Sequence, residues 1–141
     1  FIASRGRGAQ LNGHRIRVSD RKELQEALLG TGIPFLGHCD EHLDWYTQSL
    51  ATVTGRSMGL RRGGAASLDL AYVAAGRLDG FWEMGLSEWD IAAGALLIRE
   101  AGGLITDLSG GEHWYDSGNV VCGNSKLMRQ LLPLVRWSDT V

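Results

Sequence analysis

The stretch SLDLAYVAAGRLDGFWEMGLSEWDIAAGALLIREAGGLITDLSGG, residues 67–111, alternates between two periodicities. Small and apolar residues recur at helical spacing over residues 65–76 and 87–103, whereas residues 78–85 and 104–111 are short apolar runs that end in glycine. Helices and strands that alternate with such short links predict a layered α/β fold, in which helices pack on the faces of a sheet.

The flanking segments extend this alternation. Glycine-containing turns at Gly6-Arg7-Gly8 and Asn12-Gly13 separate short alternating runs within residues 1–18, which predicts antiparallel strands. No repeat or linker divides the chain. We expect the other elements to be a short helical piece over 19–25 capped by Ser19 and Asp20, a buried strand over 27–37 ended by Gly32 and Pro34, a helix over 40–54 with Leu43, Tyr46, Leu50 and Val53 on one face, strands over 59–64 and 119–124, and a helix over 125–135.

The composition is that of an ordinary globular chain. Its 141 residues are 44% hydrophobic, and 14 basic against 16 acidic residues give a formal net charge of −2, so neither nucleic acid nor a membrane is an expected obligatory partner. Cys39 and Cys122 lie far apart and form no disulfide or zinc-ribbon pattern, which favours a reducing cytoplasm. The chain starts without methionine, inside a predicted strand, so we expect it to be part of a longer protein.

Asp90 is open to two interpretations. Ser87-Glu88-Trp89-Asp90 fits a capping box, in which the acid reaches back to the amide of the serine. The same helix start, with its free amides and positive dipole, could instead hold Asp90 beside a hard cation that also touches an anionic substrate. Mg²⁺ requires octahedral oxygen coordination, so one carboxylate alone does not make such a site.

Three other segments could carry chemistry. The glycine pair in RRGGAAS, residues 61–67, opens a predicted helix, where it serves either close packing or the approach of backbone amides to a phosphate or a sugar hydroxyl. Glu83 ends an apolar strand, where its carboxylate needs water or a partner. HCDEH, residues 38–42, has histidines four apart that could ligate zinc, although such loops often arise without metal. Cys122 has no base beside it in sequence and fits a buried small side chain.

Residues 67–111 strongly resemble the inositol monophosphatase family, in particular its bacterial extragenic-suppressor branch. The family's second signature is present as Trp89-Asp90, Ala92-Ala93-Gly94 and the run Glu100 to Gly103. GRGAQLNGHRIRVS resembles the family's glycine-rich hairpin, ALLGTGIPF its following strand, and SGNVVCGNSKL its closing strand and helix. The resemblance covers nearly the whole chain and is loosest over residues 38–57.

This resemblance implies a fold, a reaction and roles for named residues. The family is a group of Mg²⁺-dependent, lithium-sensitive, usually dimeric phosphatases with an αβαβα sandwich that act on inositol phosphates and related sugar phosphates. By the resemblance Asp90 is a catalytic metal ligand, Glu83 binds substrate hydroxyls, and Gly64, Ala65 and Ala66 supply substrate-binding backbone. Many relatives have serine or threonine where this chain has Ala65, so that hydroxyl is missing.

The family's other metal-binding motifs, an upstream glutamate motif and a D-P-x-D-G-T-like motif, are absent from these 141 residues. The resemblance therefore implies the C-terminal half of the domain, with residues 1–18 ending the antiparallel sheet region and residues 19–141 forming the C-terminal α/β subdomain. We expect the isolated chain to be nearly inactive. Two alternatives stay open: a non-catalytic role with the transcription and ribosomal RNA antitermination machinery, which the branch implies, and hydrolysis of another sugar or nucleotide phosphate.

Overall fold

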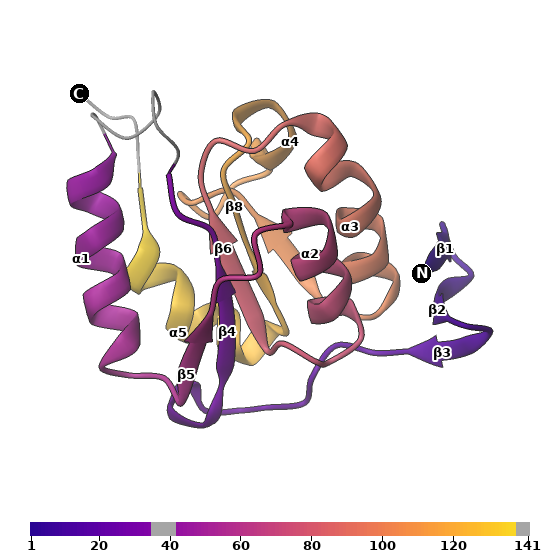
Figure 1. The fold of residues 1–141 in the computed structure, drawn as a ribbon. Coiled ribbons are helices and arrows are strands. Elements are labelled where there is room, and N and C mark those ends of the chain that lie inside the picture. Colours follow the sequence, from indigo (N-terminus) through magenta and orange to yellow (C-terminus); the bar gives the residue numbers. More distant parts are fainter. Residues whose placement is uncertain (35–41, 138–141) are drawn as a thin grey trace.

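The computed structural model describes residues 1–34 and 42–137 and arranges them in four layers (Figure 1). A small antiparallel sheet lies outermost, followed by helices α2 and α3, a five-stranded sheet, and helices α1 and α5. The elements are β1 (Ile2–Ser4), β2 (Gly8–Leu11), β3 (His14–Ile16), the 3-10 helix η1 (Leu24–Glu26), β4 (Leu28–Thr31), α1 (Leu43–Thr54), β5 (Gly59–Arg61), α2 (Ala66–Ala74), β6 (Gly80–Glu83), α3 (Glu88–Glu100), β7 (Leu104–Thr106), α4 (Trp114–Ser117), β8 (Val120–Gly123) and α5 (Ser125–Val135).

The larger sheet has the strand order β5-β4-β6-β8-β7. Strand β4 runs parallel to both β5 and β6, while β8 is antiparallel to β6 and β7. The carboxyl ends of β4, β5 and β6 therefore lie along one edge of the sheet, which is where α/β proteins usually bind ligands.

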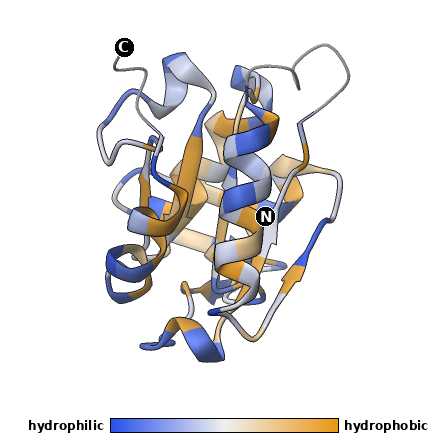
Figure 2. Ribbon diagram, turned by 90° about the vertical axis from the view of Figure 1, so that its left-hand side faces the viewer, coloured by the Kyte–Doolittle hydropathy of each residue, from blue (hydrophilic) through white to orange (hydrophobic). Residues whose placement is uncertain are grey.

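Two apolar clusters hold the layers together. One joins α2 and α3 to the sheet and to the small antiparallel sheet, and includes the fully buried Leu70, Phe81 and Ile98. The other lies between the sheet and helices α1 and α5, and includes Trp82 and Leu131. Figure 2 looks onto α1, which carries both hydrophilic and hydrophobic residues, as a helix with one buried face should.

The small antiparallel sheet, β1 to β3, is fastened to the far end of α3. Both carboxylate oxygens of Glu100 accept hydrogen bonds at 2.8 Å, one from the backbone N–H of Gly6 and one from that of Gly8. These two hydrogen bonds lower the pKa of Glu100. Asn12 and Gly13 have positive φ angles of 50° and 81°, which confirms the predicted tight turn between β2 and β3.

The layered α/β architecture and the predicted strands are present in the described residues, but two local expectations were wrong and one short helix was missed. Residues 19–23 are not helical; only Leu24–Glu26 forms a single 3-10 turn. Leu43, predicted on the buried face of α1, is 42% exposed. The short helix α4 was not predicted. Part of the expected strand over 27–37 and of the helix over 40–54 lies outside the described residues.

Contacts with α5 explain the missing helix. The Gln130 side chain accepts from the backbone N–H of Leu24 and donates to the carbonyl of Lys22, while Asn124 donates to the carbonyls of Ser19 and Arg21. Backbone groups that would have formed hydrogen bonds within a local helix thus form them with side chains at α5 and its N-cap. None of the described helices has the length and apolar character that crossing a bilayer requires.

Candidate functional site

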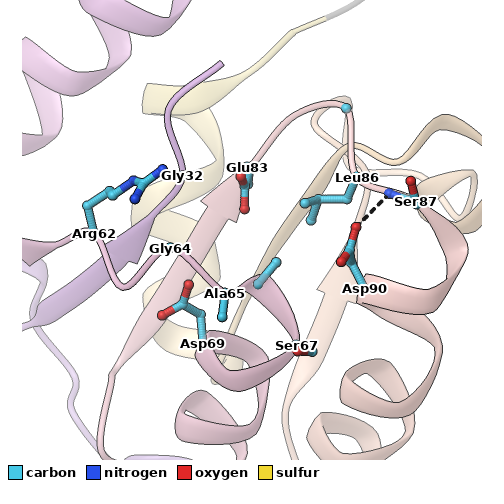
Figure 3. A pocket seen from close by; sticks show the side chains of 12 residues that line it. Gly32, Arg62, Gly64, Ala65, Ser67, Asp69, Glu83, Leu86, Ser87 and Asp90 are labelled. Carbon is cyan, nitrogen blue, oxygen red and sulfur yellow. Dashed lines mark hydrogen bonds between the residues drawn. The ribbon is translucent and has the colours of Figure 1, made fainter. Parts of the chain in front are cut away.

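A cavity of about 420 Å³ opens where the carboxyl ends of the parallel strands meet the starts of α2 and α3 (Figure 3). All five residues predicted for the site line it, so the fold brings together segments up to 26 positions apart in the sequence. Those residues are Gly64, Ala65, Ala66, Glu83 and Asp90. The cavity is also lined by residues that were not predicted as site residues: Gly32, Arg62, Ser67, Asp69, Gly85, Leu86 and Ser87.

Asp90 both caps a helix and lines the cavity. Its Oδ2 accepts a hydrogen bond from the backbone N–H of Ser87 at 3.0 Å, which is the carboxylate half of the predicted capping box. The side chain is half-buried and lies on the cavity side of the first turn of α3 (Figure 3). The two interpretations of Asp90 are therefore compatible, because one oxygen serves the helix and the other is free of partners among the described residues.

Glu83 ends β6 with its carboxylate pressed against the backbone of Gly32, which follows β4. A β-carbon at position 32 would overlap this carboxylate, so a larger residue there would force the Glu83 side chain to move. Glu83 is 7% exposed and has no hydrogen-bond or ion-pair partner within the described ranges. Burial, reinforced by the nearby charges of Asp69 and Asp90 and opposed by Arg62, raises the pKa of Glu83 to about 7.

The backbone from Gly64 to Ala66 leads into α2. Ala65 is the N-cap residue and provides no side-chain hydrogen bond, so the backbone amides of Ala66 and Ser67, which line the cavity, have no partner among the described residues. Gly64 has a φ of +84°, which suits glycine. Ser67, two residues after Ala65, is exposed and lines the same cavity.

Two charged residues in the cavity, Asp69 and Arg62, were not predicted from the sequence. Asp69 is 6% exposed, and its Oδ1 approaches Gly63 so closely that a β-carbon there would lie 2.7 Å away. Burial, partly offset by Arg62, raises the pKa of Asp69 to about 6. The signal was available in principle, because Asp69 follows Ala65 by four positions and so lies on the same helix face.

The remaining candidates from the sequence are the HCDEH segment, as possible metal ligands, and Cys122. Within residues 1–34 and 42–137, no three acidic, histidine or cysteine side chains are grouped closely enough to bind a metal ion. Of the HCDEH segment only His42 is described, so the zinc interpretation lies outside the described residues. Cys122 is fully buried in β8, and burial raises the pKa of its thiol, in agreement with the structural interpretation.

Comparison with known proteins gives a consistent result. A profile of the inositol monophosphatase family matches residues 1–139. Over 136 residues, 96% of the chain, it is 57% identical to the Nus factor SuhB of Pseudomonas aeruginosa and 51% identical to the inositol-1-monophosphatase of Rhizobium meliloti, covering 50% of each. The chain thus spans about half the length of the curated relatives it matches.

Solved structures agree. The extragenic suppressor protein suhB from Bartonella henselae superimposes with a TM-score of 0.90 at 42% identity, over 99% of this chain and 52% of that one. An inositol monophosphatase from Anabaena gives a TM-score of 0.82 at 34% identity, over 94% of this chain and 52% of that one. The β–α–β–α order seen here corresponds to four successive layers of the αβαβα sandwich. Fold, profile and relatives together show that the chain belongs to the inositol monophosphatase family.

Proposed function

We propose that the whole protein containing this chain is a Mg²⁺-dependent phosphate monoester hydrolase that converts inositol monophosphates to inositol and phosphate. The observation that carries the proposal is the convergence of Glu83, Asp90 and the uncapped start of α2 on one cavity. Relatives that are 50% and 51% identical to this chain over 136 residues are named inositol-1-monophosphatase. This chain would supply the substrate-binding side of the site and one metal ligand.

The polyol would be held by groups of opposite hydrogen-bonding character. The Glu83 carboxylate accepts hydrogen bonds from substrate hydroxyls, and each such bond favours its charged form against the burial that disfavours it. The backbone amides of Ala66 and Ser67 donate to hydroxyl or ester oxygens, and the helix dipole favours negative charge at this end. Gly64 permits the substrate ring to approach the backbone closely.

The described residues fit one side of a magnesium site. Asp90 offers one carboxylate oxygen to the cavity, and Glu83 and Asp69 add negative charge that a bound cation would relieve. One carboxylate falls short of octahedral coordination, so the remaining donors must come from outside residues 1–34 and 42–137. When bound, such an ion polarises the phosphate and lowers the pKa of a water molecule.

The test is hydrolysis of inositol 1-phosphate by the whole protein with Mg²⁺, and its inhibition by lithium. We predict that Asp90→Asn lowers kcat/KM by orders of magnitude while costing at most about 1 kcal/mol of stability, because asparagine still accepts the capping bond. Glu88→Gln, an exposed change in the same helical turn, is the matched control and should leave activity intact. Equal activity of the parent and Asp90→Asn would remove Asp90 from the site.

The isolated chain provides a second arm of this test. Because it supplies only one metal ligand in the described residues, we propose that it is nearly inactive by itself. Ordinary rates of Mg²⁺-dependent hydrolysis by residues 1–141 would contradict this. A panel of sugar and nucleotide phosphates assayed in parallel would separate inositol phosphatase activity from that of another phosphatase with the same fold.

A second candidate function is a non-catalytic contact with the transcription machinery. It is favoured by the relatives named Nus factor SuhB and by Trp89, whose side chain is 82% exposed beside the cavity residue Asp90. Retention of RNA polymerase and antitermination factors by the parent, with loss in Trp89→Ala, would support this role. We also propose that the whole protein is a cytoplasmic homodimer, which sedimentation and cell fractionation would test.

A further inference from the structure

Arg62 lies at the opposite end of the cavity from Asp90. It follows β5 directly, and its guanidinium lies on one side of Glu83 while Asp90 lies on the other (Figure 3). Arg62 and Asp90 line the same cavity. A substrate held by Glu83 between them would therefore present different substituents to the two residues.

The Arg62 guanidinium is not used by the fold. Among the described residues, no carboxylate lies within 4.0 Å of it and no hydrogen bond engages it. Arg61, its neighbour, behaves differently: its Nη1 donates to the carbonyl of Leu60 at 2.9 Å, and it does not line the cavity. Of the two adjacent arginines, only Arg62 offers an unpaired planar donor to a ligand.

The absence of a side chain at Gly64 leaves room for the Arg62 guanidinium. A β-carbon on Gly64 would come within 2.8 Å of Arg62 Nη1, and Gly64 has a φ of +84° that other residues rarely adopt. The guanidinium therefore lies over the bare backbone of Gly64 and lines the cavity, while the residue as a whole is exposed.

The charges in the cavity are arranged unevenly. Arg62 lowers the pKa values of both Asp69 and Glu83 against the effect of burial, so its field reaches both acids. An anionic substituent placed near Glu83 or Asp69 would be repelled, whereas one placed at Arg62 would meet the cavity's only lining cation among the described residues. Without a bound cation near Asp90, the charged side chains that line the cavity favour an anion at the Arg62 end.

We propose that Arg62 forms a second anion subsite, so that the whole protein prefers polyol phosphates that carry a further oxyanion, either phosphate or carboxylate. This inference rests on the proposed function, because it takes the scissile phosphate to lie near Asp90 and the polyol ring against Glu83. A guanidinium suits both kinds of oxyanion, since it can donate two parallel hydrogen bonds to either.

The experiment compares matched substrates on the whole protein. Glucose 1-phosphate and glucuronic acid 1-phosphate differ by one carboxylate, and inositol 1-phosphate and inositol 1,4-bisphosphate differ by one phosphate. For the substrates with two anionic groups, Arg62→Gln should raise KM roughly 10- to 100-fold with kcat unchanged, the range of a lost charge-assisted hydrogen bond. The single-anion substrates should keep their KM to within about twofold. Arg62→Lys should restore part of the difference, and Arg61→Gln should behave as the parent.

Calorimetric titration of the Asp90→Asn protein with the same four compounds measures binding without turnover. The Asp90→Asn protein that retains Arg62 should bind the two-anion compounds more tightly than their single-anion partners. Adding Arg62→Gln should abolish that preference. If turnover of all four compounds is absent while the binding preference persists, the proposed function fails and the subsite stands. Equal increases in KM for both substrate classes in Arg62→Gln, or no increase for either, would overturn the subsite.

Discussion

Replacing Glu83 by glutamine should stabilise the protein at alkaline pH. Glu83 is buried, has no partner among the described residues, and has a pKa raised from its ordinary value of 4.5 to about 7. Folding therefore disfavours its charged form. The penalty is absent below pH 4.5, where the carboxyl is protonated in both states, develops as the pH rises towards 7, and is complete above it.

The size of the effect follows from these two values. The difference between 4.5 and about 7 corresponds to about 3 kcal/mol, at about 1.4 kcal/mol for each pH unit. Water in the cavity screens part of this, so we expect Glu83→Gln to be about 1–3 kcal/mol more stable than the parent at pH 8. For a chain of 141 residues that is a rise of roughly 3–10 °C in melting temperature.

The assay is thermal or urea unfolding of parent and Glu83→Gln proteins between pH 5 and 8, with a chelator present so that no cation offsets the charge. The stability difference should grow with pH and then level off above about pH 7. Glu26→Gln, an exposed glutamate on η1, is the control and should show no such trend. Parallel pH profiles for Glu83→Gln and the parent, or a loss of stability that increases with pH, would refute the reasoning.

Three further changes test the packing. Gly94→Ala would place a β-carbon 2.5 Å from the immobile Cβ of Leu70 between α2 and α3, so the overpacking cost of about 1–3 kcal/mol should exceed the gain of roughly 1 kcal/mol in helix propensity, and the urea midpoint should fall. Glu100→Gln should make the small antiparallel sheet more sensitive to limited proteolysis, most clearly above the ordinary glutamate pKa, since the lowered pKa in the folded state means that stabilisation is present there and is lost on acidification. In a Cys39→Ser background, Cys122 should resist a thiol reagent until the protein unfolds; rapid labelling of the native state would contradict its burial.

The features that the sequence predicts well depend on neighbouring residues. The capping box at Asp90 and the Asn12-Gly13 turn are each specified within four positions, and both are present. The alternation of helices and strands from residue 65 onward has the same local origin, because periodicity reports which face of an element is buried. The family resemblance then placed Glu83 and Gly64 beside Asp90, and the structure brings them to one cavity.

The features that it missed depend on distant contacts. Arg62 became visible only when β5 was placed beside β4 at the edge of the sheet, because nothing in RRGG distinguishes a cavity side chain from a solvated one. For Asp69 the sequence offers only its helical spacing from Ala65, and its place in the cavity depends on how α2 packs on the sheet. The close approach of the Glu83 carboxylate to Gly32 joins residues 51 positions apart. Residues 19–23 carry genuine helix-start signals, and hydrogen bonds from the Gln130 side chain of α5 to the backbone of Lys22 and Leu24 override them.

The attachment of the small antiparallel sheet to α3 also has a kinetic consequence. The hydrogen bonds from Gly6 and Gly8 to Glu100 join residues 94 and 92 positions apart. A hairpin of this size can form within microseconds, but its docking must wait until the last turn of α3 exists and a loop of about 90 residues has closed. Substitutions in β1 to β3 should thus change the unfolding rate far more than the folding rate, which makes this layer the last to join the folded protein and the first to leave it.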